Sequence, residues 1–577
     1  MKFFTLIFIH LLLTICVISS AELTDKYKEN QTLSYDEVIA HYQKLADTYE
    51  SAQLLEYGKT DAGFPLYLFV ISEDGIFDSD SIKAAGKVTV LINNAIHPGE
   101  PCGVDASAIL AEDLLRGGVI PNSKVVTCII PAYNVGGMLN RGCCSRANQD
   151  GPEQYGFRGN AKNLDLNRDF IKADAGNTKA FFQIYHDWKP QIFIDAHSTN
   201  GADYPAQMTL ISSARSRVAE SLRTFFNVSL TNSLYKDMNK AGFSVSPYYH
   251  MFGDSIDQGL KEYMDTPRYS TGYTTLFNTM GYVTEAHMLK PYPVRVESTY
   301  EFLKSVIIYG QRHYSAVLSV YNNSMETARN IKEYGINYTL DTTQKLQLRY
   351  ESYKKKYRTS SVTGLPIHYY DTGDRDTMNI PYYATYQPTK IIKVPEYYIV
   401  PQQWKEVVER LDLNRIEYTK YRKDTLVEVE LYYIDKYETA ERPYENHYFH
   451  HSVEVRKDTQ EIEIHAGDLL IPTDQDGIRY MLETLEPEAE DSFFAWNFFD
   501  GILQQKEWFS DYVFEPKAEQ ILKDNPKLKA DFEKKKKEDK EFASNSWAML
   551  YYIYTNSKYY EKTHNRYPVY RINKTTK

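Results

Sequence analysis

The chain has 577 residues, of which 25% are charged and 42% are hydrophobic, and its formal net charge is -11. This length exceeds what one ordinary hydrophobic core supports, so two or three domains are expected. The negative charge argues against general nucleic-acid binding, and the one lysine run, 534–537, is flanked by acidic residues and fits a solvated helix face. We therefore expect no nucleic-acid partner.

The first 21 residues have the pattern of a secretory signal. Lys2 precedes an apolar run over 3–18, and three small residues at 19–21 follow before the chain becomes polar. The run is short for a membrane span, and an uncleaved anchor is the alternative. The sequence thus predicts a signal peptide at 1–21, a secreted or periplasmic protein, and no stable membrane span after signal removal.

From about residue 85, short apolar runs alternate with helical patterns. Buried strands are expected at 88–93, 124–130, 191–196 and 282–285, and helices at 105–115, 179–188 and 294–317. Such alternation is typical of an α/β layer with a largely parallel sheet.

The pattern changes near residue 325. Residues 322–358 are polar, charged and mostly helical in pattern, and a β-rich region begins near Ile367. Its strands are expected at 390–394, 425–434, 451–456 and 461–465, as in a small β-sandwich or barrel, and a helical segment follows from Asp491. The predicted domains are an α/β catalytic domain at 22–325, a helical polar connector at 326–365, and a β-rich accessory domain with a helical tail at 366–577.

Two motifs at the ends of expected strands carry metal-binding side chains. His97 and Glu100 lie in the turn after strand 88–93, and His197 ends strand 191–196. Each motif alone has a simpler interpretation: Glu100 as a helix cap, and His197 as a core histidine. Together they supply three protein ligands, and a catalytic zinc uses three ligands and keeps its fourth position open. The sequence therefore predicts one Zn²⁺ in this domain, held by His97, Glu100 and His197.

The segment between these motifs is the most specific in the chain. It contains Arg158 followed by Asp165-Leu-Asn167-Arg168. With His97-x-x-Glu100 before it and the strand ending in His197 after it, the order resembles the M14-type zinc metallocarboxypeptidase family over about residues 35–320. The C-terminal half resembles the extension of some large secreted bacterial members, around 485–488 and 492–500.

The resemblance implies a three-layer αβα fold with a central mixed, largely parallel sheet, and it implies roles for single residues. Asn167 and Arg168 match the pair that binds the substrate's terminal carboxylate, for which the arginine fork is suited. Arg158 matches the residue that stabilises the oxyanion. Asp165 matches the carboxylate that orients a zinc-bound histidine, here His97.

The general base of the family is a glutamate on a late strand, which Glu285 matches. The alternative for Glu285 is a cap of the helix after Pro291, and His287, two residues on, is treated as structural. The family also uses a tyrosine upstream of the base, and Tyr263, Tyr269 and Tyr273 compete for that role. We take Tyr273 as the substrate contact. Gly99 departs from the family, since many members carry arginine there.

The predicted function is zinc-dependent hydrolysis of C-terminal residues from peptides, through a zinc-bound water with Glu285 as base. Peptidoglycan stem peptides also end in free carboxylates, so a muropeptide substrate is a first alternative. A non-catalytic binding protein on the same fold is the second, and the presence of all three ligands, the base and both arginines counts against it.

Overall fold

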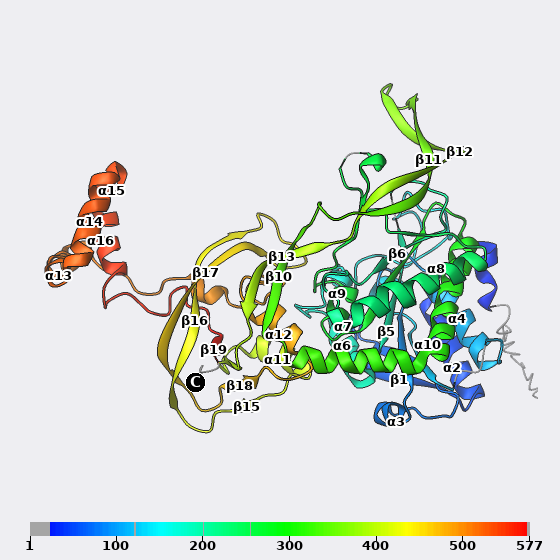
Figure 1. The fold of residues 1–577 in the computed structure, drawn as a ribbon, viewed down its shortest axis with the longest axis horizontal. Coiled ribbons are helices and arrows are strands. Elements are labelled where there is room, and N and C mark those ends of the chain that lie inside the picture. The colour runs from blue at the N-terminus through cyan, green and yellow to red at the C-terminus, as the bar shows by residue number, and fades with distance from the viewer. Residues whose placement is uncertain (1–22, 120–122, 200, 254, 574–577) are drawn as a thin grey trace, which may run out of the picture. The chain divides into compact units, whose positions relative to one another are not determined.

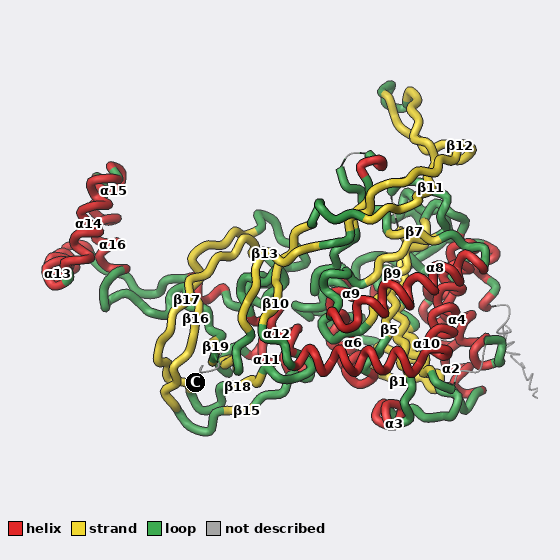
Figure 2. The backbone as a smooth tube through the Cα atoms, in the orientation of Figure 1, coloured by secondary structure: helices red, strands yellow, loops and turns green. Residues whose placement is uncertain are grey.

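A computed structural model describes residues 23–119, 123–199, 201–253 and 255–573 (Figures 1 and 2). The signal peptide predicted at 1–21 lies outside the described residues. The chain divides into two compact units: one contains the residues up to Asn330 together with Tyr338–Thr389, and the other contains Ile331–Asn337 together with Lys390 onward. No helix in the described ranges has both the length and the apolar character that crossing a membrane requires.

The first unit is built on an eight-stranded sheet with the order β1-β2-β4-β3-β5-β9-β6-β7. Its strands are β1 (Ala52–Lys59), β2 (Pro65–Ile71), β3 (Val88–Asn93), β4 (Val125–Ile130), β5 (Ile192–Thr199), β6 (Met208–Ser212), β7 (Val245–Pro247) and β9 (Met280–His287). The central strands β4, β3, β5 and β9 run parallel, whereas β1, β2 and β6 pair with their inner neighbours antiparallel. This confirms the predicted mixed, largely parallel sheet.

Helices cover both faces of this sheet, which makes three layers (Figure 1). The helices of the unit are α2 (Tyr35–Thr48), α3 (Ser79–Ala84), α4 (Cys102–Leu115), α5 (Val135–Leu139), α6 (Gly176–Trp188), α7 (Glu220–Thr224), α8 (Thr231–Lys240), α9 (Ser270–Thr275) and α10 (Tyr292–Arg329). On β5, Ile192 and Ile194 join the core with residues of α4 and α10, while Phe193 contacts Phe181 of α6. Successive strand residues point to opposite faces, so the two contacts mark two layers.

The segment after α10 differs from the predicted helical connector at 326–365. It forms β10 (Glu333–Leu340) and β11 (Leu346–Thr359), which precede β12 (Pro366–Tyr383) and β13 (Tyr386–Lys393). β11 pairs with β12, which pairs with the short β8 (Leu260–Lys261), and β10 pairs with β13. The physical reason is a period of two: Leu348 and Tyr350 pack around Leu260 and Ile380, and charged side chains alternate with them.

The second unit contains a six-stranded antiparallel sheet with the order β15-β18-β14-β19-β16-β17. Its strands are β14 (Tyr397–Val400), β15 (Thr419–Lys420), β16 (Thr425–Thr439), β17 (His450–Ile464), β18 (Leu469–Pro472) and β19 (Tyr570–Ile572), and its helices are α11 (Lys405–Leu413), α12 (Ile478–Leu485), α13 (Asp511–Asp524), α14 (Pro526–Glu538), α15 (Lys540–Ala543) and α16 (Ser546–Thr555). The β-rich character with helices near the C-terminus agrees with the expectation.

The second unit is not the sandwich or barrel that the strand spacing suggested. The two strands expected at 451–456 and 461–465 are the single strand β17. α12 is buried along its whole length. Glu486, directly after α12, contacts the hydroxyls of Tyr398 and Tyr432 on two strands, the latter at 3.0 Å. The sheet is therefore joined to a helix through buried polar contacts.

Candidate active site

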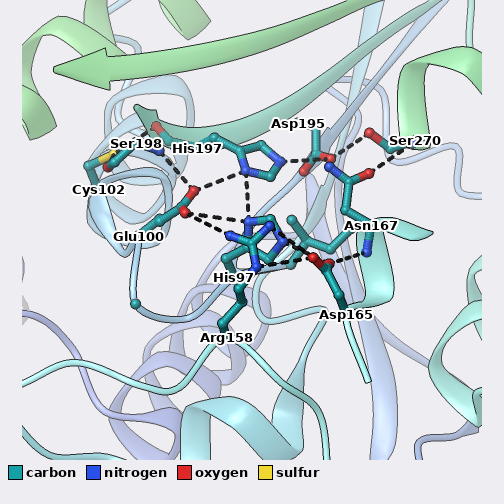
Figure 3. A network of polar contacts seen from close by, with 12 residues as sticks. His97, Glu100, Cys102, Arg158, Asp165, Asn167, Asp195, His197, Ser198 and Ser270 are labelled. Carbon is teal, nitrogen blue, oxygen red and sulfur yellow. Dashed lines mark hydrogen bonds and ion pairs between the residues drawn. The ribbon is translucent and has the colours of Figure 1, made fainter. Parts of the chain in front are cut away.

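The three predicted ligands meet at the carboxyl edge of the parallel strands (Figure 3). His97 and Glu100 lie in the loop between β3 and α4, and His197 lies near the end of β5. This edge is where open α/β sheets form their sites. Gly103 allows the approach, because a Cβ there would lie 2.2 Å from the Cβ of Ala196 on β5. The first turn of α4 therefore packs directly on the strand that carries His197.

The facing atoms of the three side chains have the spacing of ligands around one ion. The Nδ1 atoms of His97 and His197 are 3.1 Å apart, His197 Nδ1 is 3.0 Å from Glu100 Oε2, and His97 Nδ1 is 3.4 Å from Glu100 Oε1. Ligand atoms on a tetrahedral zinc with bonds of about 2.1 Å lie roughly 3.4 Å from one another. All three side chains are buried. The donor set and its spacing fit a divalent metal ion.

Each imidazole turns its other nitrogen toward a carboxylate. His97 Nε2 is 2.9 Å from Asp165 Oδ1, and His197 Nε2 is 3.1 Å from Asp195 Oδ2. These contacts fix the orientation of both rings and leave Nδ1 as the nitrogen that faces the centre. Metal-bound histidines in other proteins are commonly oriented in the same way, by a carboxylate that contacts the second ring nitrogen. Two Nδ1 atoms at 3.1 Å require a proton or a cation near them. The two rings are therefore held with their Nδ1 atoms facing one point, where a proton or a cation can lie between them.

Charges around the centre shift the pKa values of its acids. Burial alone would raise the pKa of Asp165, but His97, Arg158 and Arg168 hold it well below its usual range. Burial opposes ionisation of Glu100 too, and Arg146 and His97 keep its pKa well below the ordinary value. Both carboxylates are therefore ionised at neutral pH. Ionised carboxylates are the form that binds a metal ion or orients a metal-bound histidine.

Glu285 lies on β9 in register with His197 on the neighbouring strand β5. It lines a cavity of about 210 Å³ together with the three candidate ligands. Burial raises the pKa of Glu285 to about 8, and Glu100 adds to that rise. A carboxyl group with a raised pKa in a cleft is a candidate for proton transfer.

The same cavity is lined by three further site residues that were predicted from the sequence, namely Arg158, Asn167 and Arg168. The Arg158 guanidinium donates to Asp165 Oδ2 at 2.8 Å and lies 3.6 Å from Glu100 Oε1. Asn167 Oδ1 accepts a hydrogen bond from the Ser270 N–H at 3.0 Å. The Arg168 guanidinium lies over the ring of Tyr269, 4.4 Å from its centroid. Two cations and an amide therefore face one cavity beside the candidate metal centre.

Tyr273 does not reach the cavity, so its assignment as a substrate contact is corrected. Its side chain is fully buried, stacks on Phe182 and lies 2.9 Å from His186 Nε2 through its hydroxyl. The tyrosines that line the cavity are Tyr248, Tyr263 and Tyr269. Tyr273 belongs to α9, and its place in that helix turns the ring into the aromatic core against α6. His287, considered as a rival ligand, instead pairs with Asp203 at 2.9 Å.

Four residues near the site were not identified from sequence, namely Arg146, Asp195, Tyr248 and Asp265. Asp195 had a readable signal, because it lies two residues before His197 on a strand and so shares its face. Arg146 contacts Glu100 across 46 residues and Tyr248 reaches the cavity from a loop after β7, so no local pattern pointed to either.

No protein-family model matches the chain. Carboxypeptidase 2 of Trichophyton tonsurans is 22% identical over 429 residues, which cover 70% of this chain and 73% of that protein. Carboxypeptidase 2 of Trichophyton rubrum is 20% identical over 448 residues, which cover 74% and 77%.

Among solved structures, a metallo-carboxypeptidase from Burkholderia cenocepacia superposes with a TM-score of 0.36 at 16% identity, over 48% of this chain and 69% of that one. Carboxypeptidase A of Helicoverpa armigera superposes with a TM-score of 0.37 at 15% identity, over 52% and 80%.

Proposed function

We propose that the chain is an M14-type metallocarboxypeptidase, a zinc enzyme that removes C-terminal residues from peptides with Glu285 as general base, and its similarity to the carboxypeptidases named above supports this. One observation carries this proposal: the Nδ1 atoms of His97 and His197 and the carboxylate of Glu100 converge beside a cavity that also contains Glu285 and Arg168.

Zinc is the proposed metal because of the donor set. Two imidazole nitrogens and one carboxylate are the ligands of many catalytic zinc sites, which leave a fourth position for water or substrate. When bound, zinc lowers the pKa of a coordinated water to about 7 and polarises a carbonyl oxygen. We expect one zinc per chain, held by His97, Glu100 and His197, with Asp165 and Asp195 orienting the two imidazoles.

Glu285 is proposed to accept the proton of the attacking water and to deliver it to the leaving amine. Its strand position next to His197 supports this role, since it places the carboxylate beside the metal ligands without making it one of them. Its pKa of about 8 refers to the protein without metal. A nearby cation lowers the pKa of a carboxyl group, so metal binding will favour the ionised, proton-accepting form.

Arg168 and Asn167 are proposed to bind the terminal carboxylate of the substrate. The stacking of Arg168 on Tyr269 fixes the plane of its guanidinium, and a planar fork can donate two parallel hydrogen bonds to a carboxylate. The Ser270 N–H holds the amide oxygen of Asn167, which orients its NH₂ group as the remaining donor. This pair would restrict the enzyme to peptides with a free C-terminus.

Arg158 is proposed to stabilise the oxyanion that develops at the scissile carbonyl. Its side chain is 44% exposed and lies 3.6 Å from Glu100, so its charge is next to the metal centre and open to a ligand. A fixed positive charge at that place contributes roughly 3–4 kcal/mol to transition-state binding. Of the three tyrosines weighed from sequence, Tyr263 and Tyr269 line the cavity and are the candidates for assisting the reaction.

The proposed substrates are peptides with a free C-terminal carboxylate. Stem peptides of peptidoglycan share that group, and no lining residue of the cavity favours them over other peptides. A secreted or periplasmic location is part of the proposal, and the apolar pattern of residues 1–21 supports it.

The proposed activity is tested with one peptide in two forms, one with a free C-terminal carboxylate and one with a C-terminal amide. Mass spectrometry of the products with zinc-loaded protein should reveal loss of single C-terminal residues from the free acid and little reaction of the amide. A chelator-treated sample is the control and should be inactive until zinc is restored. Equal cleavage of both forms, or cleavage only at internal bonds, would contradict the proposal.

A further inference from the structure

Arg146 occupies space that Gly99 leaves open next to the candidate metal centre. A Cβ at Gly99 would lie 2.8 Å from Arg146 Cδ and 3.3 Å from the Gly156 carbonyl oxygen. Any side chain at position 99 would therefore collide with the arginine. Arg146 can therefore hold this position because residue 99 has no side chain.

The Arg146 guanidinium is held on three sides. It donates from Nη1 to Glu100 Oε1 at 2.7 Å and from Nε to Gln149 Oε1 at 2.9 Å, and Nη2 lies 3.5 Å from the Ser198 carbonyl oxygen. Gln149 in turn donates to the Gly99 carbonyl oxygen at 2.9 Å. The guanidinium is thus connected to the loop that carries both His97 and Glu100.

The backbone of Arg146 is also anchored. Its N–H donates to the Tyr155 hydroxyl at 3.0 Å, and Tyr155 forms a β-bridge with Gly142. The Arg146 side chain is only 15% exposed. It does not line the cavity in which the substrate is proposed to bind. Its charge is therefore directed at Glu100 and not at a substrate.

We propose that Arg146 is a positioning residue for the metal ligand Glu100, an inference that rests on the zinc site proposed above. The Ser198 N–H holds Glu100 Oε2 at 3.0 Å, and Arg146 holds Oε1 at 2.7 Å. With both oxygens fixed, the carboxylate keeps its plane toward the two imidazoles before metal binds. Loss of Arg146 removes one of these two constraints and weakens the metal site.

The test is the zinc dissociation constant of the full-length protein, measured by competition with a chromophoric chelator. We expect Arg146→Gln to weaken zinc binding 10- to 100-fold, the range found when partners of metal ligands are removed. Arg146→Lys keeps the positive charge but carries all its donors on one nitrogen, so it cannot contact Glu100, Gln149 and Ser198 as the guanidinium does and should restore only part of the affinity. Arg141→Gln is the matched control, because Arg141 donates to the carbonyl oxygens of Thr32 and Leu33, away from the site.

Two further readouts separate positioning from general stability. With saturating zinc, KM for a free-acid peptide should change less than threefold in Arg146→Gln, since Arg146 is outside the cavity. Gly99→Ala should also weaken zinc binding, because its Cβ displaces Arg146, but should add little in an Arg146→Ala background. Gly99→Ala also tests the inference if Arg146→Gln does not fold.

Zinc affinity within twofold of wild type in both Arg146→Gln and Gly99→Ala would overturn the inference, whatever happens to the melting temperature. It would leave the proposed function intact if the wild-type protein binds one zinc. A wild-type protein that binds no zinc would overturn the proposed function, and this inference with it.

Discussion

Glu285 is the single residue whose loss should affect the proposed reaction most selectively. Glu285→Gln keeps the size of the side chain and removes the proton acceptor. We expect kcat to fall by roughly 10²- to 10⁴-fold, the usual contribution of a general base. Zinc content should not change, because Glu285 is outside the ligand group. Steady-state kinetics and metal analysis on one preparation test this, and undiminished turnover would remove Glu285 from the mechanism.

Arg168 should contribute to substrate binding through the positive charge that it places next to the terminal carboxylate. Arg168→Gln replaces charge-assisted hydrogen bonds worth about 1.5–3 kcal/mol, so kcat/KM for a free-acid peptide should fall roughly 10- to 150-fold. Arg349→Gln is a matched control, since Arg349 lines a neighbouring cavity and not this one. If both variants keep wild-type kcat/KM, Arg168 does not bind the carboxylate.

Single residues at the site could be predicted where a family motif lies at the end of a predicted strand. His97, Glu100 and His197 follow apolar runs, so their convergence followed from the parallel sheet. Tyr273 was misplaced because its distance from Glu285 in sequence does not tell which way its ring points from α9. Arg146 could not be predicted, since its contact with Glu100 depends on the path of an irregular loop.

At the scale of elements, Asp105 joins α4 to segments far away in the sequence. Its Oδ1 accepts from the Leu33 N–H at 3.1 Å, and its Oδ2 contacts the Tyr292 hydroxyl of α10. Burial raises the pKa of Asp105 to about 6, from 3.8. A raised folded-state pKa means that the folded protein binds this proton more tightly. The resulting stability is present below the unfolded pKa and is lost as the pH rises through 6.

The stability contributed by Asp105 should therefore fall by about 2 kcal/mol between pH 4 and pH 6. Asp105→Asn is neutral throughout and lacks this dependence. Urea unfolding of both proteins at pH 4, 5, 6 and 7 should show the variant gaining on the wild type as the pH rises. A difference in unfolding free energy that stays constant over this range would contradict the account.

Elements with continuous apolar runs were the most predictable. β3, β4 and β5 are buried at every position, as strands covered on both faces must be. β11 was missed because its alternating pattern is interrupted by a charged run at 354–356, which resembles a solvated helix. The pairing that makes it a strand comes from β12, which follows later in the chain.

For the whole molecule, the metal should stabilise one compact unit only. His97, Glu100 and His197 all belong to the unit that contains the eight-stranded sheet. Zinc at about 100 times its dissociation constant should add about 2.7 kcal/mol to the unit that binds it. Calorimetry should therefore show one transition that rises in temperature with zinc and another that does not. A shift of neither transition would contradict the placement of the site.

The organisation of the whole chain was predictable only in outline. An α/β unit followed by a β-rich region agreed with the sequence patterns, whereas residues 338–389 group with the first unit although they are strands. Membership of a unit depends on packing between distant residues, such as Tyr350 with Leu260. Local periodicity carries no information about such partners.

The most direct measurement is anomalous X-ray scattering at the zinc edge from crystals of the zinc-loaded protein. We expect one strong peak within about 2.0–2.2 Å of Nδ1 of His97, Nδ1 of His197 and a carboxylate oxygen of Glu100. Fully zinc-loaded crystals with no peak between these three side chains, or with the zinc bound elsewhere, would contradict the proposed zinc site.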